Sequence, residues 1–204
     1  MEQAYIDYLK EVSRYASKLE IESICFKALI DSYQRVKLIE GIEKLIENRI
    51  RDLFIIDLEE HNHIIKHALD NCIIRVIPES YDPQKRKRSD IQFFLPILKR
   101  DLVFECKRLL SADSRYLNQG LIRFIMLEYA AKENDAGMIG FVINPKDFSR
   151  MLSKLKDKVR TFHCSELIDK SIFEHPYSFQ SIHIRIDTGK ILISHLFFKF
   201  CSKS

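Results

Sequence analysis

Two neighbouring runs of the chain carry residue types that can do chemistry. Asp90 opens an apolar run over residues 91–98, and a second apolar run, after a charged turn, ends in Glu105-Cys106-Lys107. The two runs are typical of a β-hairpin, which would bring Asp90 close to Glu105. Successive side chains of a strand alternate between its faces, so we expect Glu105 and Lys107 on one face and Cys106 in the opposite layer.

Two carboxylates and an ammonium on one face of a sheet predict a metal-dependent hydrolytic site. Asp90 and Glu105 supply the oxygen ligands that a hard divalent cation prefers, and we expect Mg²⁺, with Mn²⁺ as the alternative ion. The carbonyl oxygen of Cys106 is a further candidate ligand. Lys107 would orient an attacking water and offset charge that develops on a phosphate. The alternative is structural: Asp90 caps the preceding loop, and Glu105 and Lys107 form an exposed ion pair of little energetic value.

The order of these residues resembles the PD-(D/E)xK phosphodiesterase superfamily, which has the restriction-endonuclease-like fold. Asp90 and the triplet Glu105-x-Lys107 match that motif, and the triplet is the only acid-x-lysine in the sequence. The order strand, strand, strand, helix, strand over residues 70–145 is also similar to the core of that superfamily. The resemblance implies that Asp90, Glu105 and Lys107 are the catalytic set of a nuclease.

The helix expected after the motif carries residues that the resemblance connects with the substrate. Gln119 and Arg123 lie four residues apart, so they share a helix face with Tyr116. In similar nucleases a Gln or Tyr of this helix approaches the metal site or the nucleic-acid backbone. The resemblance therefore implies nucleic-acid contacts for Gln119 and Arg123, and a plain surface face is the alternative.

The resemblance also implies a further metal-binding acid on a helix ahead of the sheet. Glu47 fits this role because it borders an apolar stripe that would dock its helix on the sheet. Glu79 is a rival for the same role because it ends the first predicted strand. The sequence does not decide between the two acids, and a solvated helix charge is the alternative for Glu47.

A run of four cations stands immediately before Asp90. Lys85, Arg86, Lys87 and Arg88 are contiguous, and they would attract the polyanionic backbone of a nucleic acid at the mouth of the site. Charge runs in loops are also common as solvated turns, which is the alternative interpretation. We predict nucleic-acid contact.

Hydrophobic periodicity divides the chain into a helical region and a sheet-containing core. Residues 1–70 show helical spacing, with one stripe formed by Ile39, Ile42, Ile46, Ile50 and Leu53. Later predicted elements are strands over 72–78, 137–143, 179–186 and 191–200, a hairpin turn at 99–101 and a helix that starts at 144–147. We therefore predict an α/β (α+β) fold with a mixed central β-sheet flanked by helices. Its restriction-endonuclease-like core spans 71–204, and the N-terminal helical extension, 1–70, packs on this core in one compact domain.

Composition is typical of a globular intracellular protein. Hydrophobic residues make up 46% and charged residues 30%, and the net charge of +4 is too mildly basic to identify a nucleic-acid partner alone. The five cysteines lack C-x-x-C spacing, which predicts reduced thiols rather than disulfides or a zinc site. His183 and His195 have no ligand spacing, so we expect them to be structural. The chain shows neither a secretion signal nor an apolar run of membrane-spanning length, which predicts a cytoplasmic protein without a membrane partner.

Together these features predict a Mg²⁺-dependent endonuclease that cleaves DNA. The resemblance to small nuclease subunits of bacterial defence systems implies the effector of an anti-phage or restriction-type complex, controlled by a regulatory or sensor protein. Residues 1–70 carry more apolar residues than a small sheet can cover, so we expect them to bind that partner or to form a homo-oligomer. The alternatives are a non-catalytic nuclease-fold subunit that binds a partner protein or DNA, and an RNA-directed nuclease. The intact Asp-Glu-Lys set favours catalysis.

Overall fold

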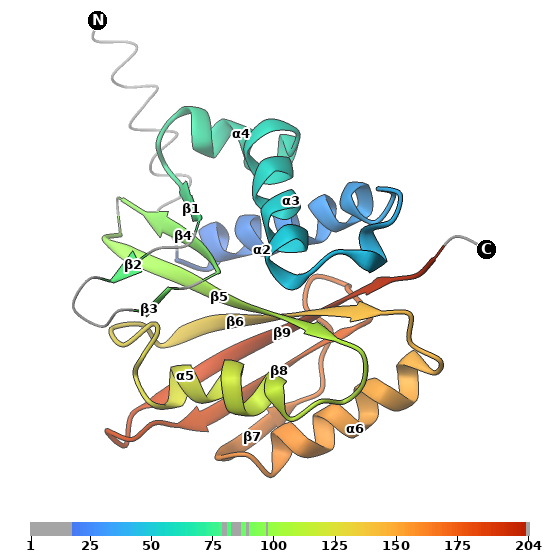
Figure 1. The fold of residues 1–204 in the computed structure, drawn as a ribbon. Helices are drawn as coiled ribbons and strands as arrows, with labels where there is room; N and C mark the ends of the chain where they lie inside the picture. The colour runs from blue at the N-terminus through green and yellow to red at the C-terminus, as the bar shows by residue number, and fades with distance from the viewer. Residues whose placement is uncertain (1–17, 79–80, 83–86, 89, 97, 203–204) are drawn as a thin grey trace, which may run out of the picture.

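The structure of the chain, a computed structural model, describes residues 18–78, 81–82, 87–88, 90–96 and 98–202 (Figure 1). Its helical elements are α2 (Lys18–Val36), the 3₁₀ turn η1 (Ile42–Lys44), α3 (Glu47–Glu60), α4 (His63–Asp70), the π-helical turn η2 (Tyr116–Leu121), α5 (Ile122–Ile125) and α6 (Phe148–Arg160). Its strands are β1 (Arg75–Pro78), β2 (Tyr81–Asp82), β3 (Lys87–Arg88), β4 (Ile91–Leu95), β5 (Arg100–Leu109), β6 (Asp135–Ile143), β7 (Cys164–Ile168), β8 (Ser178–Ile184) and β9 (Lys190–Phe200).

One mixed sheet of seven strands organises the fold. Its order is β1-β4-β5-β6-β9-β8-β7, while β2 and β3 pair only with each other. The pairs β5–β6 and β6–β9 are parallel, and the other pairs are antiparallel. A parallel pair needs a crossover connection, and η2 with α5 supplies it between β5 and β6. The predicted α/β (α+β) class, with a mixed central sheet flanked by helices, is confirmed.

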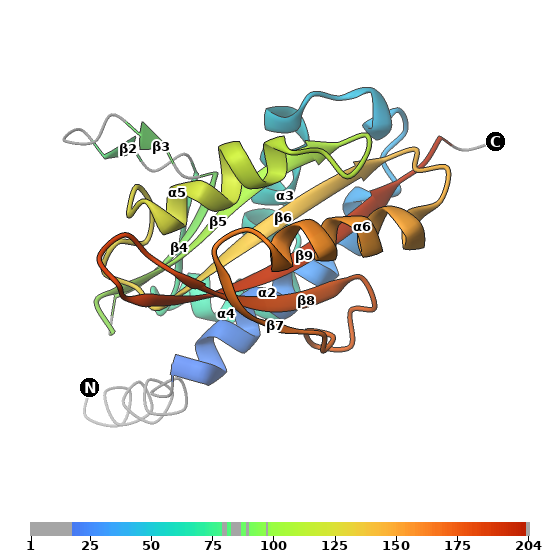
Figure 2. The same ribbon diagram turned by 90° about the horizontal axis from the view of Figure 1, so that it is seen from below.

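Helices cover both faces of this sheet (Figures 1 and 2). The N-terminal helices α2, α3 and α4 lie over one face, and η2, α5 and α6 lie over the other. The apolar side chains of the strands accordingly fall into two clusters, one on each face of the sheet. Phe104 and Cys106 join the cluster under the N-terminal helices, whereas Val103 and Leu109 join the cluster under α5 and α6. The side chain of Cys106 therefore points into the layer that the alternation predicts.

Two side chains tie the N-terminal helices to each other and to the sheet. Asn62 is the N-cap of α4, where its side-chain oxygen accepts hydrogen bonds from the first turn. Its amide also donates to the carbonyl of Ala28 (2.8 Å) and to Ser32 Oγ (2.9 Å) of α2. The ring of Tyr33 stacks on Phe198 of β9, with 4.6 Å between ring centroids. Within residues 18–70, which the structure describes, many apolar side chains lie in one core with the sheet.

The predicted helical stripe from Ile39 to Leu53 is interrupted in the structure. Gly41 has φ 72°, in the left-handed region that favours glycine, and the chain turns there before α3 begins. Ile39 is 40% exposed and Ile46 is 65% exposed, so neither belongs to the buried core. The prediction of one continuous stripe was wrong because periodic isoleucines cannot reveal a break that a single glycine makes.

The predicted hairpin and first strand are shorter than their apolar runs. β4 ends at Leu95, the chain turns through Lys99 at φ 50°, and β5 already begins at Arg100, so the turn precedes the predicted 99–101. β1 begins at Arg75 because the N–H groups of Ile73 and Ile74 donate to a carbonyl at the end of α4. The predicted helix after residue 147 is confirmed as α6, which Asp147 caps through Arg150 N–H (2.9 Å).

Candidate active site

The site is built on β5, where Glu105 and Lys107 share one face of the strand. Lys107 Nζ donates to Glu105 Oε1 at 2.6 Å and to the carbonyl oxygen of Cys106 at 2.8 Å. Glu105 is 1% exposed and Lys107 is 9% exposed, so this pair is buried. The alternative of an exposed surface ion pair does not hold, because burial removes both charges from water at a substantial cost.

Asp90 lies across the hairpin from Glu105. Pairing of Ile91 with Phe104 sets the register of β4 on β5, and one further step places Asp90 opposite Glu105. Asp90 Oδ2 accepts a hydrogen bond from the backbone N–H of Cys106 at 2.7 Å, and Oδ1 accepts one from Arg51 at 3.2 Å. Two of the three sequence-predicted catalytic residues are therefore cross-strand neighbours, and the third is two residues along.

Glu47 reaches the same place from the first turn of α3. Its Oε2 accepts from the backbone N–H of Arg108 at 2.6 Å, and its Oε1 lies 3.5 Å from Lys107 Nζ. The structure thus brings Glu47 to the Lys107 side of the site. Its rival Glu79 lies outside the described residues.

Glu47 and Asp90 share a second task at the edge of β5. β4 begins at Ile91, opposite Phe104, so the N–H groups of Cys106 and Arg108 beyond that point face outward along one edge. Asp90 accepts from the first and Glu47 from the second. The two carboxylates therefore accept the hydrogen bonds from β5 that a longer β4 would have accepted.

Burial dominates the electrostatics of Glu105. Burial, followed by the nearby charge of Asp90, raises the pKa of Glu105 to about 8, although Lys107 and Arg123 oppose the shift. Burial alone would lower the pKa of Lys107, but the carboxylates of Glu105 and Glu47 outweigh it and raise that pKa. Glu105 Oε2 is buried without a hydrogen-bond partner among the described residues. Lys107 and Arg123 both donate to Oε1, so the other oxygen, Oε2, is removed from water without a compensating partner.

A hard cation fits the orphaned Glu105 Oε2 and the neighbouring carboxylate of Asp90. Oxygen ligands suit Mg²⁺, which keeps several waters and needs only one or two protein carboxylates. In the part of the chain that the structure describes, no three His, Cys, Asp or Glu side chains form a group ready to hold a metal. Glu105 and Asp90 are thus the two carboxylates of this site that could hold a hard cation.

The predicted substrate helix is a π-helical turn followed by α5, and its residues divide between two environments. Arg123 Nη1 donates to Glu105 Oε1 at 3.0 Å, so this residue, predicted to contact nucleic acid, binds the Glu105 carboxyl in the structure. Gln119 is exposed and lines a pocket of about 290 Å³ with Lys107. Tyr116, expected on the same face, is instead fully buried, because the wider π-helical turn rotates it toward β9.

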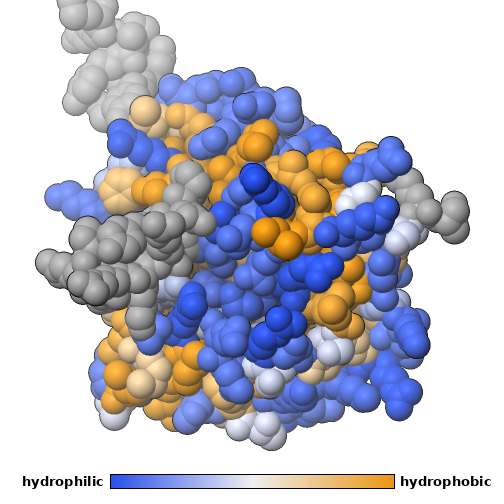
Figure 3. Space-filling view, viewed as in Figure 1, coloured by the Kyte–Doolittle hydropathy of each residue, from blue (hydrophilic) through white to orange (hydrophobic). Residues whose placement is uncertain are grey.

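The pocket beside Lys107 lies on a polar part of the surface. Its other lining residues are Ile46, Glu47, Arg108 and Arg115. Figure 3 shows hydrophilic residues gathered across the middle of this face, between the N-terminal helices and the layer of α5 and α6. Gly120 lets η2 approach the sheet, since a Cβ there would lie 2.6 Å from Met138 Cε. Gln119, the residue before Gly120, lines the pocket together with Lys107.

Three site residues escaped the sequence analysis. Arg51 follows Glu47 by four residues, a spacing that places both on one helix face and could have identified it. Tyr129 contacts Arg123 through its hydroxyl and through its ring, 5.2 Å from the guanidinium carbon, and no local pattern indicates this contact. Arg115 lines the pocket from the loop before η2. The predicted contacts Lys85 and Arg86 lie outside the described residues, as do the side chains of Lys87 and Arg88, whose backbone forms β3.

His183 and His195 belong to a separate, buried hydrogen-bonded chain. His183 Nδ1 must donate to the carbonyl of Phe162 (3.0 Å), so its Nε2 accepts from Ser181 Oγ (2.7 Å). Ser181 Oγ then accepts from His195 Nε2 (2.7 Å), and His195 Nδ1 accepts from Tyr116 Oη (2.8 Å). Every donor and acceptor of the two rings is satisfied only when both histidines are neutral.

Comparisons with known proteins do not assign this site to a class. No family model, curated protein or solved structure matches the chain. Among the described residues, none of the helices combines the length and the apolar character needed to cross a membrane.

Proposed function

We propose that the chain is a Mg²⁺-dependent nuclease of the PD-(D/E)xK type that hydrolyses DNA phosphodiester bonds. The observation that carries the proposal is the carboxyl of Glu105, which is buried opposite Asp90 with Oε2 unpartnered. Lys107 lies two residues along and lines an open pocket. A buried carboxylate oxygen without a donor is a position that a bound cation would satisfy.

Asp90 and Glu105 are the residues that would hold the cation, and Glu47 is placed to support them. Bound Mg²⁺ would supply an activated water and charge stabilisation at the phosphate. Asp90 can keep its bond to the N–H of Cys106 through Oδ2 while Oδ1 serves the metal in place of Arg51. Glu47 can likewise keep the N–H of Arg108 through Oε2.

Lys107 and Gln119 would act on the phosphate. Both line the same pocket, so a phosphodiester that enters it meets an ammonium and an amide donor. The Lys107 ammonium offsets the negative charge that grows on the phosphate oxygens in the transition state. Arg123, which also contacts Tyr129, donates to the same oxygen of Glu105 as Lys107 and so helps to position that carboxyl.

We retain DNA as the substrate, and we propose that a regulatory partner or self-association controls the activity within a bacterial defence complex. The support is the sequence itself, which has a full catalytic set but no recognition motif. A duplex break also needs two such sites. RNA cleavage and a non-catalytic binding role are the outcomes that the following experiment distinguishes.

The test compares Asp90→Asn, Glu105→Gln and Lys107→Met with the unaltered protein on supercoiled plasmid and on RNA. We expect Mg²⁺-dependent cleavage of the plasmid that EDTA abolishes and that each substitution lowers by a factor on the order of 10³. Glu166→Gln, an exposed carboxylate of β7, is the matched control and should leave the rate unchanged. Equal cleavage by the Glu105→Gln and Glu166→Gln variants would remove the proposed site. Cleavage of RNA alone would reassign the substrate.

A further inference from the structure

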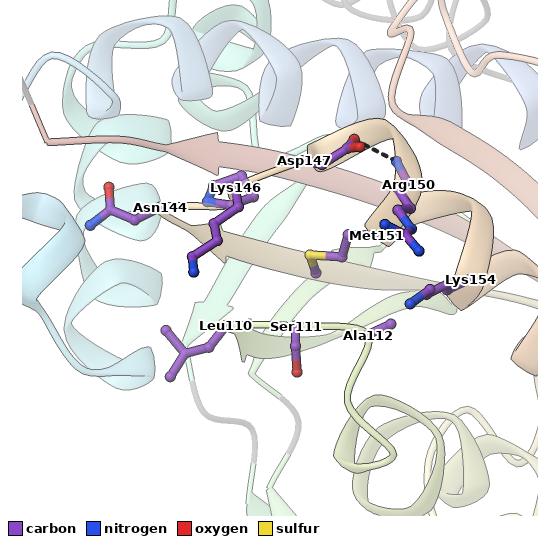
Figure 4. Close-up of a pocket in the computed structure, with 10 residues that line it drawn as sticks. Leu110, Ser111, Ala112, Asn144, Lys146, Asp147, Arg150, Met151 and Lys154 are labelled. Atoms are coloured by element: carbon purple, nitrogen blue, oxygen red, sulfur yellow. Dashed lines mark hydrogen bonds between the residues drawn. The ribbon is translucent and has the colours of Figure 1, made fainter.

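A second pocket opens beyond the carboxyl end of β5. It has a volume of about 460 Å³ and lies between the loop after β5 and the loop that leads from β6 into α6 (Figure 4). The lower wall in Figure 4 is Leu110, Ser111 and Ala112, and the upper wall runs from Asn144 to Lys154. Three cations, Lys146, Arg150 and Lys154, line this pocket, and the sequence analysis assigned them no role.

The cations of this pocket belong to a row on the solvent-facing side of α6. Lys146, Arg150, Lys154 and Lys158 follow one another at four-residue steps and are all exposed; we call them the α6 basic row. The opposite side of the helix is buried in the core through Phe148, Met151, Leu152, Leu155 and Val159. Since a helix rises about 1.5 Å per residue, the helical members are spaced by about 6 Å and span about 12 Å.

This row concentrates positive charge on one element. The helix Phe148–Arg160 contains five basic residues and one acid, a local balance of +4 that equals the net charge of the whole chain. The single acid, Asp157, pairs with Arg160 at 3.0 Å and so does not neutralise the row. Lys146, Arg150 and Lys154 form no ion pair with another described residue.

The row also lies next to the candidate active site. Leu110 follows Lys107 by three residues of extended chain, a distance of about 10 Å. Lys158 Nζ donates to the carbonyl oxygen of Ala112 at 2.6 Å and so joins α6 to the same loop. Farther along that loop, Arg115 lines the pocket that contains Lys107. The loop after β5 therefore connects the pocket of Lys107 with α6, and its Arg115 is paired with Asp113 at 2.8 Å.

We propose that the α6 basic row binds successive phosphates of the DNA strand whose scissile bond occupies the Lys107 pocket. The inference rests on the proposed function for its choice of substrate. Regularly spaced, exposed cations along an open groove suit a repeating polyanion better than a single small anion, which an enclosed pocket would hold. The described walls of the pocket present no aromatic ring on which a base could stack, so the interaction is with the backbone and is independent of sequence.

The experiment measures DNA binding and phosphodiester chemistry separately. The row variant carries Lys146→Gln, Arg150→Gln and Lys154→Gln, and the matched control carries Lys66→Gln, Lys132→Gln and Lys190→Gln, with the same loss of charge at other exposed positions. Fluorescence anisotropy of a labelled DNA duplex is recorded in EDTA over a range of salt concentrations. We expect the row variant to reduce the slope of log affinity against log salt by roughly 0.9 for each phosphate that it no longer neutralises, and the control to keep the slope of the unaltered protein.

Two outcomes would overturn the inference. Equal slopes for the row variant and the control would mean that only net charge matters, and equal affinity for polyglutamate and for DNA would identify an acidic protein as the partner. Mg²⁺-dependent hydrolysis of bis(p-nitrophenyl) phosphate, which is too small to reach α6, is measured in parallel and should be the same in both variants. A reduced slope without such hydrolysis in any variant would sustain DNA binding by α6 and reject the proposed nuclease. Hydrolysis with an unchanged slope would support the proposed nuclease and reject DNA binding by α6.

Discussion

Two buried polar clusters lie on the sheet, and they differ in whether their hydrogen bonds are complete. In the chain from Tyr116 through His195 and Ser181 to His183, each donor meets one acceptor and no charge is present. In the cluster around Glu105, a carboxyl stays buried among cations and a second acid with one oxygen unpartnered. A cluster selected for stability resembles the first, whereas the second retains an electrostatic cost that a ligand can relieve.

The sharpest way to test this contrast is the pH dependence of stability, because the two clusters titrate in opposite directions. Burial lowers the pKa of His183 to about 4 and that of His195 well below its usual value. Between about pH 6.5 and 4 these two histidines therefore bind more protons in the unfolded chain than in the folded one, and their contribution to stability falls as pH falls. His183 alone should cost about 2 kcal/mol between pH 7.5 and 5.

Glu105 should mask part of this loss. Its raised pKa makes the folded state bind the extra proton, so its contribution to stability grows as pH falls from about 8. Urea unfolding in EDTA at pH 7.5 and 5 should consequently show a steeper decline for Glu105→Gln than for the unaltered protein. His61→Asn, at an exposed histidine, is the control, and its stability should depend on pH in the same way as that of the unaltered protein. Parallel curves for Glu105→Gln and the unaltered protein would contradict the contrast.

A smaller loss of stability is expected when the hydrogen-bonded cluster of Tyr116, His195, Ser181 and His183 loses the Tyr116 hydroxyl. Tyr116→Phe leaves His195 Nδ1 without a hydrogen bond in a site closed to water, which should lower the free energy of unfolding by roughly 1 to 2 kcal/mol. Cleavage per folded molecule should not change. Tyr177→Phe, which keeps its ring against Phe148, is the control and should cost less than about 0.5 kcal/mol. A loss of activity at unchanged stability would give Tyr116 a catalytic rather than a structural role.

The smallest expected change is the stability of Glu105→Gln in EDTA at pH 7.5. With a pKa of about 8 the carboxyl is mostly protonated at pH 7.5, so the amide replaces a largely neutral group at nearly constant volume, and the free energy of unfolding should change by about 1 kcal/mol or less. Addition of Mg²⁺ should raise the melting temperature of the unaltered protein and not that of the variant, because binding to the folded state alone stabilises it. Equal Mg²⁺ shifts for both proteins would place the cation elsewhere.

The sequence predicted the elements whose signals are local and missed the contacts that depend on distant chain segments. Strand alternation correctly separated Cys106 from Glu105 and Lys107, and the helix predicted to start at 144–147 is present as α6. Burial of the Glu105–Lys107 pair and the contact of Arg123 with Glu105 could not be predicted, because they require the packing of α5 on β5. Local periodicity also cannot register a π-helical turn, which is why Tyr116 was placed on the wrong face.

The carboxylates at the edge of β5 have a consequence for how this protein behaves in a crowded solution. An uncovered strand edge presents N–H and C=O groups that can recruit a strand from a neighbouring molecule and begin aggregation. Asp90 and Glu47 occupy two successive N–H groups of that edge with charged side chains. Residues whose proposed task is to hold a metal thus also keep the sheet from extending into another chain, and their loss would threaten solubility as well as chemistry.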